Sequence, residues 1–298
     1  MMLTVVGTIA LDTMGLVATL PEAETTAGVT QLRAEMPGGT AGNVAAALAR
    51  LGAPPRLVSA VGADFAGSAY ERALLAAGVS LDGVERVDDA ITSRAYVFHE
   101  PSGKQVTFFH AGGGRAFRGA TPIRGRAHFS AGEIARYPSL MQQADWVSFD
   151  PGQETFHRPL DEIAACFAHV DVLFLNRHEL ARIENEGSWP IARLLELGVE
   201  AVVESRGGEG TLVHTPKGRF AAPAPPVETI ADPTGAGDAH RAGFLFALDR
   251  GADLGAAARF AGIMGAFAIE HVGAQTGLPT LAQATARHEA FWKERPFK

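Results

Sequence analysis

Short apolar runs alternate with helical stretches along most of this chain, and that alternation constrains the fold more than any other feature. Strands that are apolar on both faces and separated by helices are typical of a mainly parallel sheet covered on both sides. The pattern predicts an α/β fold with its ligand site at the carboxyl ends of the strands. The expected strands are Leu3–Val6, Pro55–Val61, Trp146–Phe149, Val170–Leu175, Ala201–Glu204 and Thr211–His214. The expected helices are Ala41–Leu51, Gly67–Ala77, Leu160–His169, Ile191–Leu197, Ala239–Asp249 and Ala256–Val272.

Residues 93–110 break the alternation, because two β-rich runs flank the sequence Pro-Ser-Gly-Lys. This pattern predicts a hairpin. We expect a single domain over residues 1–298, in which segments 13–36 and 92–111 form an inserted β lid. Such an attachment often closes over a binding site. A peripheral hairpin that takes no part in binding is the alternative.

Composition and charge exclude several classes of protein. Cys166 is the one cysteine among 298 residues, so no intramolecular disulfide can form, which fits a reducing compartment. A net charge of −7 argues against nucleic acid as the main partner. The start of the chain lacks the basic region of a signal peptide, and no long apolar window is suited to span a membrane. We therefore expect a cytoplasmic protein with neither a nucleic-acid nor a membrane partner.

Two aspartates flank a glycine turn in DPTGAGDAHRAGF, residues 232–244, just before an expected helix. Backbone N–H groups of Gly235, Ala236 and Gly237 at a helix N-terminus would form an anion site. Asp238 gains from the field of the helix, stays ionised and can act as a general base. An anion site beside a base suits phosphoryl transfer. An ordinary helix cap behind a glycine turn is the structural alternative. The segment is neither a Walker A loop nor a dinucleotide fingerprint.

Four motifs resemble, in sequence and in order, those of the ribokinase/PfkB family of carbohydrate and nucleoside kinases. The first is DPTGAGDAHRAGF itself. The others are PGGTAGNVAAALARLG at 37–52 with VGADFAG at 61–67, Asn-Arg-His-Glu at 176–179, and SRGGEG at 205–210. The resemblance covers residues 3 to about 280. It implies a ribokinase-like α/β fold, a small β lid and transfer of a phosphoryl group from ATP to a hydroxyl group.

The resemblance assigns roles by motif position. Asp238 would be the base that deprotonates the acceptor, and residues 235–237 would form the anion hole. Asp12, Gly39 and Asn43 would bind the sugar hydroxyls of the acceptor. The positions that would lie against ATP are Asn176, Ser205, Gly207 and Gly210. An ordinary strand-to-strand turn is the alternative for the last three.

The same resemblance implies two cations. Glu179, with Asn176, would help to hold hydrated Mg²⁺, which prefers oxygen ligands and keeps several waters. A capping box at these two residues is the alternative, and both roles can hold together. Many members also bind a monovalent cation beside the anion hole. Asp232 and Thr234, with the backbone around Gly273, are therefore the expected ligands of K⁺.

Finer similarities concern the acceptor. Four segments resemble archaeal-type nucleoside kinases, adenosine kinase among them, which implies phosphorylation of a nucleoside 5′-hydroxyl: FDPGQ, FLNRHEL, DPTGAGDAHRAGF and GAQTGLPT. Tyr96 and Phe98 share a strand face, whereas Phe108 and Phe109 lie on opposite faces. We expect Phe98 to contact the base and Gln153 to bind a base edge or a ribose hydroxyl. Packing of these aromatics within the lid or at a dimer interface is the alternative.

Three other hypotheses remain open from the sequence. A sugar kinase for ribose, fructose or a similar acceptor would use the same machinery. A phosphosugar acceptor would need basic residues, for which Arg33, Arg94 and Arg115 are candidates. A catalytically silent nucleotide sensor would be expected to lack the base or the glycine turn, and both are intact.

Some relatives pair through their lids, so a homodimer is also expected.

Overall fold

The main sheet has nine strands in the order β13-β12-β11-β10-β9-β8-β1-β4-β5. The computed structural model describes residues 2–102 and 104–297; Met1, Lys298 and Gly103, which belongs to the expected Pro-Ser-Gly-Lys turn, lie outside the described residues. Neighbours from β11 to β5 are parallel, whereas β12 and β13 are antiparallel, which confirms the mainly parallel sheet. The strand bounds are β1 Thr4–Val6, β4 Arg56–Gly62, β5 Ser80–Val87, β8 Arg126–Phe129, β9 Trp146–Phe149, β10 Val172–Asn176, β11 Ala201–Ser205, β12 Thr211–Thr215 and β13 Gly218–Ala222.

Helices cover both faces of this sheet, and β1 shows why its strands are continuously apolar. Val5 packs into the core under α1, α2, α8, α9 and α10, whereas the adjacent Val6 packs into the core under α3, α5, α6 and α7. Both side chains are fully buried because successive strand residues point to opposite faces. The helix bounds are α1 Thr40–Arg50, α2 Ala69–Ala76, α3 Tyr137–Met141, α4 Glu154–His157, α5 Leu160–Phe167, α6 Arg177–Asn185, α7 Ile191–Leu197, α8 Ala236–Asp249, α9 Leu254–Ile269 and α10 Leu281–Trp292.

The order of the strands reverses at β1. The chain proceeds from β1 to β4 and β5 on one side, and from β8 to β11 on the other. Ligands of open α/β sheets bind beyond the carboxyl ends of the strands at such a reversal. This is where β1 passes through a short loop into Ala10 and Asp12.

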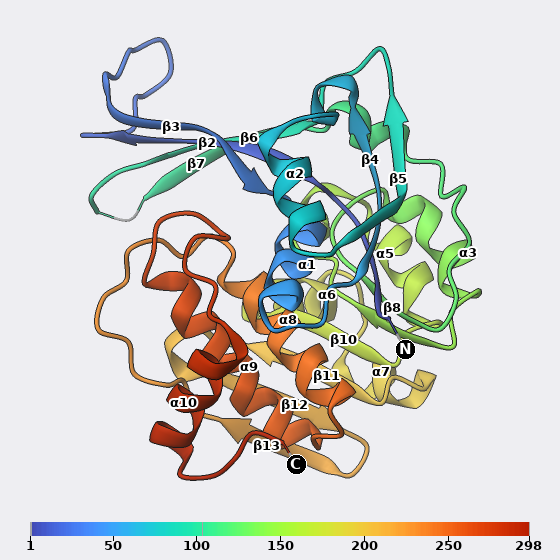
Figure 1. Cartoon of the computed structure of the whole chain (residues 1–298). Coiled ribbons are helices and arrows are strands. Elements are labelled where there is room, and N and C mark those ends of the chain that lie inside the picture. The colour runs from blue at the N-terminus through green and yellow to red at the C-terminus, as the bar shows by residue number, and fades with distance from the viewer. Residues whose placement is uncertain (1, 103, 298) are drawn as a thin grey trace.

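A second, smaller sheet stands to one side of the main body (Figure 1). Its strands are β2 (Ala10–Val17), β3 (Val29–Gly38), β6 (Ser93–His99) and β7 (Gln105–His110), in the order β3-β2-β6-β7. Parallel pairing of β2 with β6 joins the two expected segments. The first segment is longer than expected, since it pairs from Ala10 to Gly38 rather than only over residues 13–36. We call this sheet the small sheet.

Some strands and helix bounds differ from the expectations. The strands that were missed have sequences less apolar than those of the sheet interior. Strands β5, β8 and β13 were not expected: β5 and β13 lie at the sheet edges, and β8 contains Arg126 and His128. Helix α6 follows the capping box at Asn176, and α8 begins at Ala236 rather than Ala239. Among the described residues, no helix has the length and apolar character needed to cross a membrane.

Candidate active site

The glycine turn of residues 235–237 forms the N-terminus of α8. Gly235 is the N-cap in a left-handed conformation, with φ of 77°. A Cβ there would overlap Ala274, so both backbone conformation and close approach require glycine. Ala236 and Gly237 begin the helix, so their N–H groups belong to its first turn. The N–H of Ala236 donates to the carbonyl oxygen of Pro233 at 3.2 Å, before the helix begins. The turn therefore has the geometry of an anion site.

Asp238 follows in the same helical turn and is half-buried. Its Oδ2 accepts a 2.7 Å hydrogen bond from Nδ2 of Asn43, on α1. Burial raises the pKa of Asp238 to about 6, although the charge of Arg241 and the Asn43 hydrogen bond both lower it. A carboxylate with such a pKa is ionised at neutral pH and remains basic enough to accept a proton.

Asn43 is held in turn by Gln275. The side-chain amide of Gln275 donates to Oδ1 of Asn43 at 2.9 Å and to the hydroxyl of Tyr70 at 2.8 Å. Tyr70 donates to the carbonyl oxygen of Gly38, at the end of β3. These bonds make Asn43 present its donor to Asp238, and they connect the base to the small sheet.

Asp12 lies at the start of β2 and is only 9% exposed. Its Oδ1 is buried and has no hydrogen-bond partner. Burial, together with the charges of Asp238 and Asp232, raises the pKa of Asp12 to about 7. An unpartnered buried acceptor is costly, so the atom is suited to receive a hydroxyl donor from a ligand.

The strand register shows on which face of the small sheet Phe98 lies. Asp12 pairs with Ala95 of β6, whereas Phe98 pairs with Gly15 and packs where a Cβ of that glycine would be. Alternate residues point to opposite faces, so Phe98 and Asp12 lie on opposite faces of the small sheet. Phe109 pairs with Ala95 and therefore shares the face of Asp12. Contact of Phe98 with a base stays a prediction, which its position on the face opposite Asp12 does not support.

The other expected acceptor residues are at separate places. Gly39 is the N-cap of α1 with φ of 81°, and its carbonyl accepts the N–H of Asn43 at 2.8 Å. Gln153 is exposed at the N-cap of α4. Its side chain makes no cap hydrogen bond. A role for Gln153 in acceptor binding stays a prediction.

Asn176 and Glu179 form the capping box that the sequence offered as an alternative. Oδ1 of Asn176 accepts the N–H groups of His178 and Glu179, at 2.8 and 2.9 Å. The Glu179 carboxylate accepts the Asn176 backbone N–H at 2.7 Å and its side-chain amide at 2.6 Å. Glu179 is 2% exposed, and burial foremost raises its pKa. The cap is therefore present, and contact with metal or phosphate stays a prediction.

The expected nucleotide turn begins beside this cap. Ser205 ends β11 and pairs with Asn176, so both lie at the carboxyl ends of adjacent strands. Residues 207–209 form a short 3₁₀ turn that is closed by a hydrogen bond from the N–H of Gly210 to the carbonyl of Gly207. Nothing lies within 4 Å of a Cβ built on Gly207. The backbone is open to the approach of a ligand at Gly207, whereas a Cβ on Gly210 would overlap the carbonyl of Ala222.

Asp232 joins the two loops expected to bind a monovalent cation. Its Oδ1 accepts the N–H of Thr234 at 2.9 Å, and its Oδ2 accepts the N–H of Gly273 at 2.8 Å. The residues that the structure describes contain no group of three or more His, Cys, Asp or Glu side chains placed to hold a metal ion. Mg²⁺ is commonly held by only one or two carboxylates plus waters and phosphates. The single carboxylate of Glu179, together with Asn176, is therefore a suitable set of protein donors for Mg²⁺.

Comparison with known proteins decides the family. The model of the pfkB family carbohydrate kinases matches residues 2–121 and 139–281. The chain belongs to the pfkB family. It is therefore a kinase that transfers a phosphoryl group from ATP to a hydroxyl group, as the motif resemblance implied.

Three relatives of this pfkB kinase cover nearly its whole length. It is 35% identical to a nucleoside kinase of Methanothermobacter thermautotrophicus, over 98% of this chain and 96% of that protein. It is 33% identical to an ATP-dependent ribose-1-phosphate kinase of Halopiger xanaduensis, over 93% of each. The Burkholderia thailandensis nucleoside kinase solved in complex with inosine superposes with a TM-score of 0.91 at 28% identity, covering 99% of this chain and 98% of that one. These matches confirm the ribokinase-like fold.

Sequence reasoning missed four residues that the structure brings close to Asn43 and Asp238. Gln275 and Tyr70 orient Asn43, as described above. Arg241 is buried on α8 and pairs with Asp150, whose Oδ1 accepts Nη2 of Arg241 at 2.9 Å. Both charged residues belong to quoted motifs, so an arginine within an otherwise apolar helix was the available signal. The partner, 91 residues away, was not visible in the sequence.

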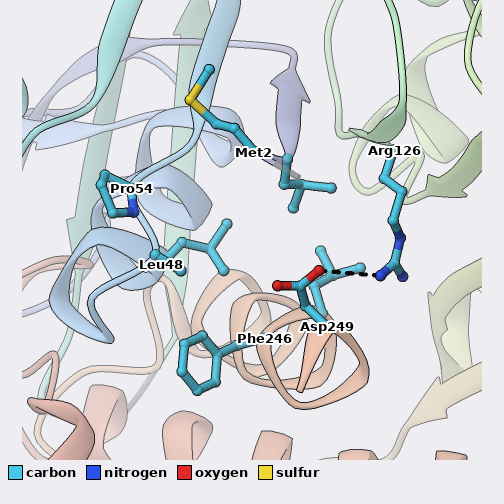
Figure 2. Close-up of a pocket in the computed structure, with 9 residues that line it drawn as sticks. Met2, Leu48, Pro54, Arg126, Phe246 and Asp249 are labelled. Carbon is cyan, nitrogen blue, oxygen red and sulfur yellow. Dashed lines mark hydrogen bonds and ion pairs between the residues drawn. The ribbon is translucent and has the colours of Figure 1, made fainter. Parts of the chain in front are cut away.

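A cavity of about 170 Å³ lies elsewhere, near the amino end of β1 (Figure 2). None of the expected site residues lines it. Arg126 pairs with Asp249 at its edge, at 3.4 Å, where α8 ends. Asp249 and Asp238 therefore lie near opposite ends of the same helix. The residues that line the cavity are Met2, Leu3, Leu48, Ala53, Pro54, Arg126, Leu245, Phe246 and Asp249.

Proposed function

We propose that this pfkB kinase phosphorylates the 5′-hydroxyl of a nucleoside, with Asp238 as the general base and residues 235–237 as the anion hole. The observation that supports this most is the arrangement around α8. The base follows the glycine turn directly, Asn43 contacts the base, and the unpartnered Oδ1 of Asp12 belongs to the same cluster of charges.

The proposed reaction proceeds in line. Asp238 takes the proton of the 5′-hydroxyl as its oxygen forms a bond to the γ-phosphorus of ATP. The bond from that phosphorus to the bridging oxygen breaks, and ADP leaves with the electron pair. The N–H groups of residues 235–237 stabilise charge on the transferring group. Asp12, Gly39 and Asn43 hold the ribose, and Asp238 finishes the step protonated.

Cations fit this scheme at the two sites described. Mg²⁺, when bound, neutralises phosphate charge, and Glu179 with Asn176 would hold it through water. Asp232 and Thr234 would hold K⁺ beside the anion hole. Asn176, Ser205, Gly207 and Gly210 would line the nucleotide, because they meet at the carboxyl ends of β10 and β11.

The choice of a nucleoside rests on the relatives. A protein named nucleoside kinase is 35% identical over nearly the whole chain, and a structural neighbour was solved with inosine. The direct experiment measures ADP release with ATP and Mg²⁺, with and without K⁺. It compares adenosine, inosine, guanosine and cytidine with ribose, fructose and their phosphates. Turnover on nucleosides far above turnover on sugars is the expected result. Release of ADP that no acceptor stimulates would contradict kinase function and favour a sensor.

A sugar-phosphate acceptor is the second candidate, since one relative is a ribose-1-phosphate kinase. Arg33 pairs with Met14 and so lies on the face of the small sheet that carries Asp12. Arg94 lies on the other face and is paired with Asp64 at 2.7 Å. Arg115 is exposed. If ribose 1-phosphate is the better acceptor, Arg33→Ala should raise its KM and leave the KM for a nucleoside unchanged.

We also propose a homodimer through the small sheet. The face opposite Asp12 exposes four apolar side chains from β3, β6 and β7, and such a patch marks a contact surface. Phe108→Glu on this face should lower the mass measured by light scattering to that of one chain. Phe109→Glu, the neighbouring phenylalanine on the Asp12 face, is the matched control. The exposed residues are Val29, Leu32, Tyr96 and Phe108, with Leu32 and Phe108 62% and 61% exposed.

A further inference from the structure

Arg241 is the one arginine or lysine among the buried side chains of residues 2–102 and 104–297. It lies on α8, three positions after Asp238, and is 6% exposed. A buried guanidinium is costly unless it is paired. Its partner Asp150, just beyond β9, is 2% exposed. Nη2 donates to Oδ1 of Asp150 at 2.9 Å, and Nε faces Oδ2 in a second close contact.

This two-point pairing fixes the plane of the guanidinium. Oδ1 of Asp150 also accepts the N–H of Gly152 at 3.1 Å, so the carboxylate is held by its own loop. One hydrogen bond from Nη2 and one ion-pair contact at Nε set orientation as well as distance, which a lysine cannot do. Arg241 is thereby directed toward the beginning of its own helix.

The guanidinium packs against the glycine turn. A Cβ on Gly237 would overlap Nη1 of Arg241. The positive charge therefore lies immediately behind the proposed anion hole, one helical turn from Asp238. An unpaired, mobile arginine would not keep that position.

Around Arg241, carboxylates outnumber positively charged side chains. The histidines near it are neutral, since burial foremost and then the charge of Arg241 lower the pKa values of His128 and His240 to about 3. The charge of Arg241 favours ionisation of Asp238, whereas that of Asp150 opposes it. The acidic groups that face this region are Asp12 of β2, Asp150 after β9, Glu179 of α6, Asp232 of the loop before α8, and Asp238 of α8 itself.

We propose that Arg241, oriented by Asp150, is a positioning residue for phosphoryl transfer, which holds the 235–238 turn in place and supplies the buried positive charge that faces Asp238. The proposal rests on the proposed function, in which Asp238 accepts the proton of the acceptor. A salt bridge that only stabilises the fold is the competing explanation, and the two can be separated experimentally.

The experiment compares Arg241→Met with the double variant Asp150→Asn/Arg241→Met. Removing one partner of a buried pair is strongly destabilising, whereas replacing both charges by neutral groups is often close to neutral. We expect the double variant to regain most of the wild-type Tm but to keep a kcat about 100-fold low, the scale of losing an oxyanion-hole donor. The acceptor Kd should change little. The acid limb of the kcat profile should move to higher pH, because the charge of Arg241 affects the pKa of Asp238 more than the charge of Asp150 does. A double variant with wild-type kcat and pH profile would overturn the proposal.

Arg241→Lys keeps the test decisive if the double variant does not fold. Lysine retains the charge but not the fork, so kcat should lie between those of wild type and Arg241→Met. Equal kcat for the lysine and methionine variants would also overturn the proposal. Arg126→Met removes an arginine paired with the other end of α8 and should leave kcat and the pH profile unchanged (Figure 2).

Failure of the proposed function gives a different result. If the wild-type chain releases no ADP in response to any acceptor, or Asp238→Asn retains turnover, the function fails and this inference fails with it. If the wild type is active, Asp238→Asn is inactive and the double variant is normal, only the role of Arg241 fails.

Discussion

The side-chain amide of Asn43 donates a 2.7 Å hydrogen bond to Oδ2 of Asp238, although 195 positions separate the two residues. The proposed acceptor site and the proposed base are thus in direct contact. An acceptor hydroxyl has to approach both groups, so it would enter an existing polar arrangement. This relationship links the following predictions.

Replacing the base should affect turnover far more than binding. Asp238→Asn keeps the shape of the side chain but removes its basicity, so kcat should fall by about 10²–10⁴-fold, the range for general-base loss. The acceptor Kd from calorimetry should stay within a few-fold of wild type. Asp249→Asn, near the other end of α8, is the matched control and should be fully active. Near-native turnover of Asp238→Asn would remove the residue from its role.

Asp12→Ala should act mainly through acceptor affinity. The variant removes the unpartnered acceptor atom, and so the acceptor KM should rise by about tenfold or more, the scale of a hydrogen bond to a charged group. The KM for ATP should not change, because the nucleotide turn lies beyond β11. Initial rates at varied acceptor and fixed ATP measure this. An unchanged acceptor KM would contradict the proposed role of Asp12 in binding the acceptor hydroxyls.

The kcat/KM of the enzyme should fall as the pH is lowered from 7 toward 5. The pKa values of Asp238 and Asp12 are raised, to about 6 and about 7, so both become protonated as pH falls through that range. Because the base must be ionised, kcat/KM should rise with pH from 5 toward 7 and level off above both pKa values. The two carboxylates interact, so the midpoint of this rise in kcat/KM is a property of the pair and not of either carboxylate alone. Asp12→Asn should move it to lower pH by removing a like charge. A profile that stays flat down to about pH 5 would exclude Asp238 as the titrating base, since an ordinary aspartate titrates near 3.9.

Gln275 should affect turnover of the acceptor, although it is neither the proposed base nor one of the residues proposed to hold the ribose. Gln275→Met keeps the length of the side chain but removes the donor that orients Asn43. The variant loses the hydrogen bonds to both Asn43 and Tyr70. The bond to Asn43 is worth about 1 kcal/mol, so kcat/KM for the acceptor should fall by at least roughly fivefold to tenfold. The exposed Gln142→Met is the matched control. Wild-type kinetics for both variants would mean that Asn43 needs no support from Gln275.

Those roles that depend on contiguous residues were predictable from the sequence. The turn at Gly235, the acid that follows it and the capping box at Asn176 each lie within a few residues, so short-range geometry suffices to propose them. The parallel sheet was also predictable, because strands covered on both faces must be apolar at successive positions, as Val5 and Val6 are. Polar or edge strands such as β8 lack that signal.

Tertiary structure alone decided which distant residues meet and which face of a strand looks inward. Alternation places Phe98 and Asp12 on opposite faces once β2 and β6 are paired, but their register is set by long-range hydrogen bonds. Arg241 acquires a partner only because packing brings the end of β9 to α8. Local propensity determines turns, caps and strands within a few residues, whereas the burial and pairing of charges depend on the whole folded chain.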